Sequence, residues 1–310
     1  MQFSTPVNIK PKKTIDHNSR IMMLGSCFAE NIGKKLIECG FNVVINPMGI
    51  LYNPLSIHIA LTRIIEGREF TEDELFYHNG LWASFMHHGS FSHADKNKAL
   101  KMMNERLHES YEQLKNATHL IITFGSAEVY EYNNQIVSNC HKLPSRQFTH
   151  RLLSINEITT PYYSLFPTTY SLLPIFTISP VRYLGEGAHH GQINKSTLLL
   201  ATDEICKKTG ADYFPSYEIM MDELRDYRYY AADMIHPSDI AVEYIFERFT
   251  ETYLTNEAIR TTEEIKKIKK SLAHRPLHPD SEEYDKFKKK LSQQIATIAR
   301  KYPNIKINKL

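Results

Sequence analysis

Residues 21–29 read I-M-M-L-G-S-C-F-A, and they decide the fold that we expect of this 310-residue chain. The four apolar residues predict a buried strand, and the Gly-Ser pair that follows is typical of the turn from a strand to a helix. Apolar residues at helical spacing then continue to residue 37, and Gly40 marks the end of that helix. The β-branched residues of 41–45 predict a second strand. A strand, a helix and a strand in this order favour a parallel sheet with helices on its faces.

The same alternation continues along the chain. The helices that we expect lie after Ser154 and at residues 54–66, 94–116, 194–208 and 239–254. The buried strands that we expect lie at residues 119–124, 175–178 and 213–214, and two hairpins have turns at residues 78–80 and 133–134. In the tail, Pro276 and Pro279 are expected to separate two helices. The sequence therefore predicts an α/β domain over residues 1–255 and a basic helical extension over residues 256–310.

The formal net charge of +2 hides an asymmetry between these two parts. Residues 256–310 hold 14 Lys and Arg against 7 Asp and Glu, a net charge of +7, which leaves −5 for the rest of the chain. The lysine clusters at 266–270 and 286–290 fit either contact with nucleic acid or the solvated face of a helix, where Glu residues pair with them. We favour the solvated face, because no base-stacking aromatic residues or base-reading module accompany the lysines. We therefore expect no nucleic-acid partner.

Cysteine usage and apolar segments bear on the location of the protein. The four cysteines are scattered and form no C-x-x-C pair, which is typical of reduced thiols in the cytoplasm. Residues 1–20 contain no apolar core of a signal peptide, and no apolar stretch is long enough to span a bilayer. We expect a cytoplasmic protein without a membrane segment, and its oligomeric state stays open.

Three of the expected parallel strands end in small or polar residues, at 25–26, 125–126 and 179–180. In open parallel sheets, ligands bind beyond the carboxyl ends of the strands. Any turn from a strand to a helix favours Gly and Ser, so each loop alone is weak evidence. The three loops together predict a crevice at that edge of the sheet.

Ser26 is the first candidate for chemistry in this crevice, and two roles are open to it. Its side chain suits the N-cap of the following helix. It also suits a nucleophile, with the amides of the helix start nearby to hold an oxyanion. A nucleophilic serine needs a base, and the base needs a partner that fixes its tautomer. Asp233 and His236 supply both ahead of the last domain helix, although their D-x-x-H spacing alone is non-specific.

Residues 25–29, G-S-C-F-A, resemble the motif that gives the GSCFA domain family its name. Further blocks that are similar to those of the family lie at residues 46–54, 123–130, 139–142, 179–182 and 233–238. Several motifs in the same order make the resemblance far more specific than one motif would. It covers residues 21–249 and leaves the basic tail outside.

That family is similar to the SGNH, or GDSL-like, hydrolases. The resemblance implies a three-layer α/β/α sandwich with a mainly parallel sheet. It also implies a serine hydrolase that cleaves an ester, such as an O-acetyl or other acyl group on a carbohydrate or small molecule, without a metal or an organic cofactor. Ser26 matches the nucleophile, and Asp233 and His236 match the Asp and His of the last block. Gly49 matches the glycine of the second block, whose amide faces the oxyanion.

One departure concerns the third block, which reads G-x-N-D in the larger group and G-S-A-E at residues 125–128 here. The Asn of that block donates to the oxyanion, whereas Ala127 has no side-chain donor, and losing one donor costs about 10²–10³ in rate. We expect Asn139 or His141 to complete the site, because their block follows the hairpin after the third strand. Glu128 suits a contact to a substrate hydroxyl and a solvated position equally well.

Other functions stay open. Transfer of the acyl group to a sugar in place of water needs the same residues, and a module that binds a carbohydrate or a partner without catalysis would explain Ala127. Cys27 is an alternative nucleophile, because a helix N-terminus lowers the pKa of a thiol. Arg182 fits either an anionic substrate group or a structural ion pair. The histidine pairs at 87–88 and 189–190 lack the spacing of a zinc motif, so we expect no metal site.

Overall fold

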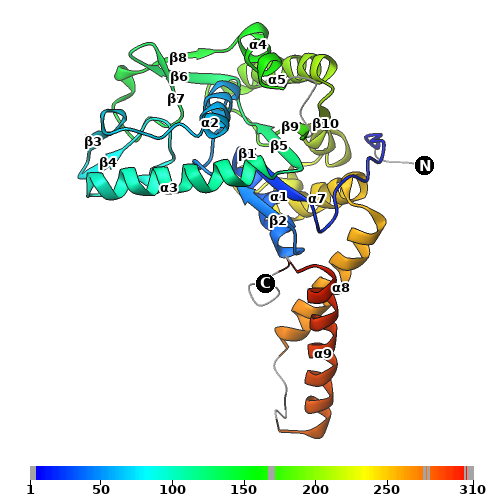
Figure 1. The fold of residues 1–310 in the computed structure, drawn as a ribbon. Coiled ribbons are helices and arrows are strands. Elements are labelled where there is room, and N and C mark those ends of the chain that lie inside the picture. The colour runs from blue at the N-terminus through cyan, green and yellow to red at the C-terminus, as the bar shows by residue number, and fades with distance from the viewer. Residues whose placement is uncertain (1–4, 167–171, 275–276, 278–279, 304, 306–310) are drawn as a thin grey trace.

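Five parallel strands form the central sheet of the protein, in the order β10-β9-β5-β1-β2 (Figure 1). The structure is a computed structural model that describes residues 5–166, 172–274, 277, 280–303 and 305. The strands of this sheet are β1 (Arg20–Gly25), β2 (Asn42–Ile45), β5 (His119–Phe124), β9 (Leu173–Ile178) and β10 (Asp212–Phe214). Because every neighbouring pair is parallel, the carboxyl ends of all five strands lie at one edge.

Helices and two small antiparallel sheets connect and flank these strands. The helices are α1 (Cys27–Glu38), α2 (Pro54–Glu66), α3 (Lys96–Lys115), α4 (Ile155–Leu165), α5 (Gly187–Thr209), α6 (Ser216–Glu218), α7 (Asp239–Tyr253), α8 (Asn256–Leu272) and α9 (Glu282–Lys301). Short helical turns are η1 (Glu72–Glu74), η2 (Gly89–Phe91), η3 (Ser145–Gln147), η4 (Ile219–Glu223) and η5 (Tyr227–Tyr229). One small sheet pairs β3 (Phe76–His78) with β4 (Leu81–Ala83), and the other joins β6 (Glu128–Tyr132), β7 (Gln135–Val137) and β8 (Thr149–Leu152).

Helices pack against both faces of the central sheet. Successive side chains of a strand point to opposite faces. Met22 and Leu24 of β1 therefore join a core with α2, α3, α4 and α5, whereas Ile21 and Met23 join a second core with α1 and α7. A strand that is buried on both faces must be apolar throughout, which is why an uninterrupted apolar run predicted it. The expectation of an α/β fold with a central parallel sheet is confirmed.

Helix α2 shows why its expected boundaries agree with the structure. The side chain of Asn53 accepts a hydrogen bond from the amide of Ser56 at 2.7 Å and so caps the helix. Pro54 follows at the first helical position, where its missing N–H costs nothing. Local residues alone fix this start.

Helix α5 and strand β8 depart from the prediction for reasons that the sequence explains. Helix α5 begins at Gly187 and not at Asn194, because its first turns, G-A-H-H-G, contain weak helix formers that do not reveal a helix in the sequence. Strand β8 was not predicted at all. Thr149, His150 and Arg151 are polar and exposed in succession, so the strand lacks the alternation that indicates one half-buried face.

The basic tail forms a helical hairpin, α8 and α9, that extends away from the sheet (Figure 1). A small apolar cluster holds the two helices together, and it includes Ile265, Ile268, Leu291 and Ile298. The two expected tail helices are confirmed, while Pro276 and Pro279, expected to separate them, lie outside the described residues. Among the described helices, none combines the length and the apolar character that a bilayer span requires.

Gly25, at the end of β1, lies where β1 and β5 approach each other closely. Its φ of +139° is rare for a residue with a side chain, and a Cβ there would lie 2.1 Å from the carbonyl oxygen of Thr123. We expect Gly25→Ala to lower the free energy of unfolding in urea by about 2–5 kcal/mol. Gly210→Ala is the matched control, because Gly210 also has a positive φ but nothing lies within 4 Å of the added Cβ. We expect Gly210→Ala to lower the free energy of unfolding by only about 1 kcal/mol. Equal losses in the two variants would contradict the close approach of Gly25 to Thr123.

Candidate functional site

A cavity of about 420 Å³ lies beyond the carboxyl ends of the central strands. Strand β1 pairs with β2 on one side and with β5 on the other, so the strand order reverses between β1 and β5. Such a switch point is where open α/β sheets bind ligands. We call this cavity the serine pocket, and its lining includes Ser26, Cys27, Ile50, Ser126, Glu128, Asn139, Ser179, Arg182 and His236. The expected crevice at the three loops is therefore present.

Ser26 caps helix α1 and faces the serine pocket at the same time. Its Oγ accepts a hydrogen bond from the amide of Phe28 at 3.3 Å, and only 1% of the residue is exposed. A hydroxyl that accepts one hydrogen bond still has its proton to donate. The amide of Cys27 is the first of the helix and has no intrahelical acceptor, so it is available to an anion beside Ser26. The two roles considered for Ser26 do not exclude each other.

Asp233 and His236 form a hydrogen-bonded pair. His236 Nδ1 lies 2.6 Å from Asp233 Oδ2, and Asp233 Oδ1 accepts hydrogen bonds from the amides of Ile235 and His236 at 2.9 Å each. The amide and the ring of His236, together with the Ile235 amide, lower the pKa of Asp233 to about 2. The carboxylate is therefore ionised at neutral pH, and it favours the tautomer of neutral His236 that leaves Nε2 as an acceptor.

Ser26, the third member of the predicted set, shares the serine pocket with His236, but within the described chain it makes no hydrogen bond to that histidine. The His236 side chain is half exposed (49%), whereas Ser26 is buried. The site thus consists of a formed Asp–His pair at the surface and a serine at the floor of the same pocket.

Gly49 is placed differently from what the resemblance implies. Its amide donates to the carbonyl of Asn46 at 2.8 Å, within the turn that leads to the pocket, and so it is already occupied. The next residue, Ile50, lines the pocket, and its amide donates to no described residue. Of these two neighbouring amides, that of Gly49 is therefore occupied, whereas that of Ile50 has no acceptor among the described residues.

The loop with the missing Asn has an unexpected arrangement. Ala127 is fully buried in the core, and its amide donates to Asn194 Oδ1 at 2.9 Å. Ser126 Oγ accepts from Asn194 Nδ2 at 2.9 Å and from the amide of Glu128 at 3.0 Å. The Ser126 hydroxyl proton has no acceptor among the described residues, and Ser126 lines the serine pocket. Ser126 is thus a hydrogen-bond donor at the pocket that the sequence did not indicate.

The structure distinguishes between the two residues, Asn139 and His141, that were expected to replace the missing donor. Asn139 lines the serine pocket, its Oδ1 accepts from the amide of His141 at 2.8 Å, and its Nδ2 bonds to no described residue. His141 does not line the pocket. Its Nε2 lies 2.8 Å from the carbonyl oxygen of Ser84, and burial lowers its pKa. Of the two, only Asn139 has a free donor near the cavity.

Glu128 is buried and paired, so the alternative of a solvated carboxylate is wrong. Only 4% of its side chain is exposed, and its two oxygens lie 2.5 Å from His190 Nε2 and 2.9 Å from His150 Nε2. His150 comes from β8, which the sequence did not predict. The Glu128 carboxylate therefore holds the wall of the pocket together through two histidines.

The structure bears on two further sequence interpretations, Cys27 as the nucleophile and the histidine pairs as metal ligands. Burial raises the pKa of the Cys27 thiol, although the helix amides oppose this, so the thiolate that a nucleophilic cysteine needs is disfavoured. His87 is buried against the rings of Phe70 and Phe91, whereas His190 binds Glu128. In the described part of the protein, no group of three or more His, Cys, Asp or Glu residues is placed to hold a metal ion.

Lys195 is the most unusual residue that the sequence analysis missed. It is 3% exposed, and its Nζ donates to the carbonyl oxygens of Gly125 and Ser179 at 2.8 Å each. These carbonyls stand at the ends of β5 and β9, so one ammonium group ties two loops of the pocket together. Burial lowers the pKa of Lys195 to about 7. A helical lysine is normally solvated, and no local signal indicates otherwise.

Two family models match the chain. Residues 20–249, which include every residue of the serine pocket, match the model of the GSCFA family. The chain belongs to the GSCFA family. Residues 265–310 match a second model, the C-terminal domain of GSCFA domain proteins, so the tail also belongs to a GSCFA protein and does not lie outside the resemblance as expected. No curated protein and no solved structure is detectably similar to the chain.

The buried Lys195 predicts how the stability of this GSCFA protein depends on pH. Its pKa is about 7 in the folded chain and ordinarily 10.5, so between these values the unfolded chain binds more protons and folding becomes more favourable as pH rises. Compared with Lys195→Met, the wild type should gain up to about 1.4 kcal/mol of unfolding free energy for each pH unit above 7. Urea unfolding at pH 7, 8 and 9 measures this difference.

Lys207→Met is the control for this experiment, since Lys207 is exposed on the same helix and paired with Asp203. We expect the wild type and this control to show no comparable divergence with pH. A difference between the wild type and Lys195→Met that stays constant from pH 7 to 9 would contradict the lowered pKa.

Proposed function

We propose that this GSCFA protein is a serine hydrolase that cleaves an ester, an O-acetyl or other acyl group carried by a carbohydrate or small molecule. The observation that supports the proposal most is that Ser26 and His236 line the same pocket, while Asp233 is hydrogen-bonded to Nδ1 of the His236 imidazole. A serine, a base and a group that orients the base are the parts that acyl transfer needs.

The proposed reaction uses each part in turn. Ser26 Oγ attacks the ester carbonyl carbon while His236 Nε2 takes the hydroxyl proton. The bond to the alcohol then breaks, and the same proton passes to the alcohol oxygen. Water then attacks the acyl-enzyme while His236 takes its proton, the bond between the acyl carbon and Ser26 Oγ breaks, and the acid leaves. The proton passes from His236 to Ser26 Oγ, which restores the hydroxyl and the neutral imidazole. Asp233 stabilises the imidazolium throughout, and the reaction requires His236 to close onto Ser26.

The oxyanion of each tetrahedral intermediate needs donors at the floor of the pocket. We assign this role to the amides of Cys27 and Ile50, which are not occupied by the turn as that of Gly49 is. The side-chain donor that Ala127 cannot supply comes from the Ser126 hydroxyl or from Asn139 Nδ2, both at the same cavity. Ser126 is favoured because two accepted hydrogen bonds fix its oxygen, which aims the remaining proton.

The finer assignments of the resemblance belong to the same proposal. Helices on both faces of a parallel sheet support a three-layer sandwich similar to that of the SGNH hydrolases. The four cysteines are all free thiols, which supports a cytoplasmic location. Acyl transfer to a sugar hydroxyl proceeds through the same acyl-enzyme, with the sugar hydroxyl in place of the water.

A binding module without catalysis is the second candidate, and one observation favours it. In the structure as described, Ser26 and His236 are not hydrogen-bonded. If the loop of His236 never closes onto Ser26, the pocket binds a carbohydrate or a partner without cleaving it.

Covalent labelling separates these two functions. We expect a fluorophosphonate probe to label the wild type at Ser26, because only an activated serine reacts with it. Ser26→Ala should abolish labelling and lower the hydrolysis rate of activated acetyl esters by about 10³-fold or more. Cys27→Ala, the neighbouring control, should retain both. A folded wild-type protein that is neither labelled nor active would contradict the hydrolase proposal.

Substitution of the side-chain donors tests the proposed oxyanion site. We expect Ser126→Ala to lower kcat by about 10²–10³ with little change in KM, because the donor acts mainly on the transition state. Asn139→Ala should have a smaller effect, and Ser292→Ala, an exposed serine of α9, should have none. Steady-state kinetics on one acetyl ester measures all three. An unchanged kcat in both Ser126→Ala and Asn139→Ala would exclude these residues as donors.

A further inference from the structure

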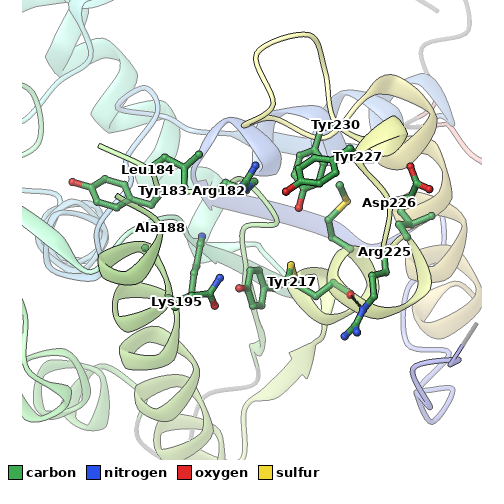
Figure 2. Close-up of a pocket in the computed structure, with 15 residues that line it drawn as sticks. Arg182, Tyr183, Leu184, Ala188, Lys195, Tyr217, Arg225, Asp226, Tyr227 and Tyr230 are labelled. Carbon is green, nitrogen blue, oxygen red and sulfur yellow. Dashed lines mark hydrogen bonds between the residues drawn. The ribbon is translucent and has the colours of Figure 1, made fainter. Parts of the chain in front are cut away.

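A second cavity of about 260 Å³ adjoins the serine pocket, and we call it the tyrosine cavity (Figure 2). Its lining includes Arg182, Lys195, Tyr217, Tyr227 and Tyr230. Arg182 and Tyr183 line both cavities, so the two cavities lie side by side and share a wall. The sequence analysis gave this region no role beyond the open question about Arg182.

Two basic side chains at this cavity lack a carboxylate partner within the described chain. Lys195 is buried and bonded only to the carbonyls of Gly125 and Ser179, and among the described residues no Asp or Glu lies within ion-pair distance of it. The guanidinium of Arg182 donates to the carbonyl of Met234 at 2.9 Å, and it likewise pairs with no described carboxylate. For the buried Lys195, a charge without a counter-ion is costly, and a negative charge supplied by a ligand would offset that cost. Arg182 is only half-buried, so its charge stays partly solvated.

The acidic residue at the same cavity does not neutralise these cations. Asp226 accepts a hydrogen bond from the amide of Arg228 at 2.9 Å and lies 3.6 Å from its guanidinium. Arg225 is paired with Asp222 at 2.8 Å. Lys195 and Arg182 are therefore the two lining cations that remain open to an anion.

Tyrosine rings form the other walls of the cavity. Arg182 lies 5.5 Å from the ring of Tyr230 and 5.8 Å from that of Tyr227, while Lys195 Nζ lies 5.6 Å from the ring of Tyr217. Figure 2 shows Lys195 rising from α5 beside Tyr217, with Tyr227 and Tyr230 across the cavity. Tyrosine offers a flat apolar face and a hydroxyl, which together suit the ring of a sugar. At about 260 Å³, below the roughly 300–1,000 Å³ of sites for drug-sized ligands, the cavity suits one small ring.

We propose that the tyrosine cavity binds the anionic group of an acidic carbohydrate, and that Arg182 and Lys195 contact this group. The ester of the same molecule then lies at Ser26. This assignment rests on the proposed hydrolase function for the position of the ester only. The anion is a carboxylate, as in a sugar acid, or a phosphate, as in a sugar phosphate. Both present the same charged oxygens to the two cations.

Calorimetric titration of the full-length Ser26→Ala protein tests the assignment without catalysis. The probes are glucuronate, glucose 6-phosphate and glucose, which share a ring and differ in charge. We expect at least one anionic sugar to bind about 10-fold or more tightly than glucose, and the tighter of the two identifies the anion. Equal affinities for the three sugars would overturn the proposal.

Substitutions in the same background locate the anion. Arg182→Met should lower the affinity for the preferred anionic sugar by about 10- to 100-fold and leave that for glucose nearly unchanged. Lys195→Met should do the same, and Arg182→Met decides the matter if Lys195→Met does not fold. Lys207→Met, an exposed lysine of the same helix, is the matched control and should change nothing. A preference for the anion that survives Arg182→Met would overturn the assignment.

The two proposals can fail separately. An anion preference that depends on Arg182, in a protein whose wild type is not labelled by a fluorophosphonate, leaves the tyrosine cavity assigned and excludes the hydrolase. A labelled and active wild type without that preference leaves the hydrolase and excludes the anionic substrate.

Discussion

The close approach of β1 and β5 at Gly25 is the constraint on which the site depends. The amide of Gly25 donates to the Asn46 side chain at 2.9 Å, and its carbonyl accepts from the amide of Leu51 at 3.0 Å. With no Cβ to keep Thr123 away, the strand end is drawn to both neighbouring segments. Ser26 is placed by this contact, because it follows directly and begins α1. The segment up to Leu51, which brings Ile50 to the pocket, is fixed by the same two hydrogen bonds.

Helix α5 contributes the second constraint through two buried polar side chains. Asn194 holds the loop at Ser126 and Ala127, and Lys195 holds the carbonyls of Gly125 and Ser179. A buried amide whose oxygen and nitrogen both have partners, such as that of Asn194, rigidifies a loop at little cost. The ammonium of Lys195 is different, because carbonyl dipoles alone do not repay the desolvation of a charge. The same residue that orders the pocket therefore also favours a negative charge beside it.

The sequence predicted those features that local patterns determine. The strands at residues 21–24, 119–124 and 175–178 are buried on both faces, so their apolar runs are unmistakable. The contact of Asp233 with His236 spans three residues and needs no knowledge of the fold. By contrast, the burial of Lys195 arises only when α5 packs across the ends of β5 and β9, and a polar residue carries no mark of such a contact. Likewise, a single hydrogen bond of the turn decides that the amide of Gly49 is occupied while that of Ile50 is not.

Arg182 connects the two cavities to the Asp–His pair in a way that bears on the proposed mechanism. Its amide donates to the carbonyl of Ile235 at 3.0 Å, and its guanidinium donates to that of Met234 at 2.9 Å. Arg182 is therefore hydrogen-bonded to the loop between Asp233 and His236. An anion bound to this guanidinium would contact the same side chain that holds the loop of the base. In the proposed mechanism, His236 has to close onto Ser26, and a substrate that also excludes water strengthens every charge interaction in the pocket.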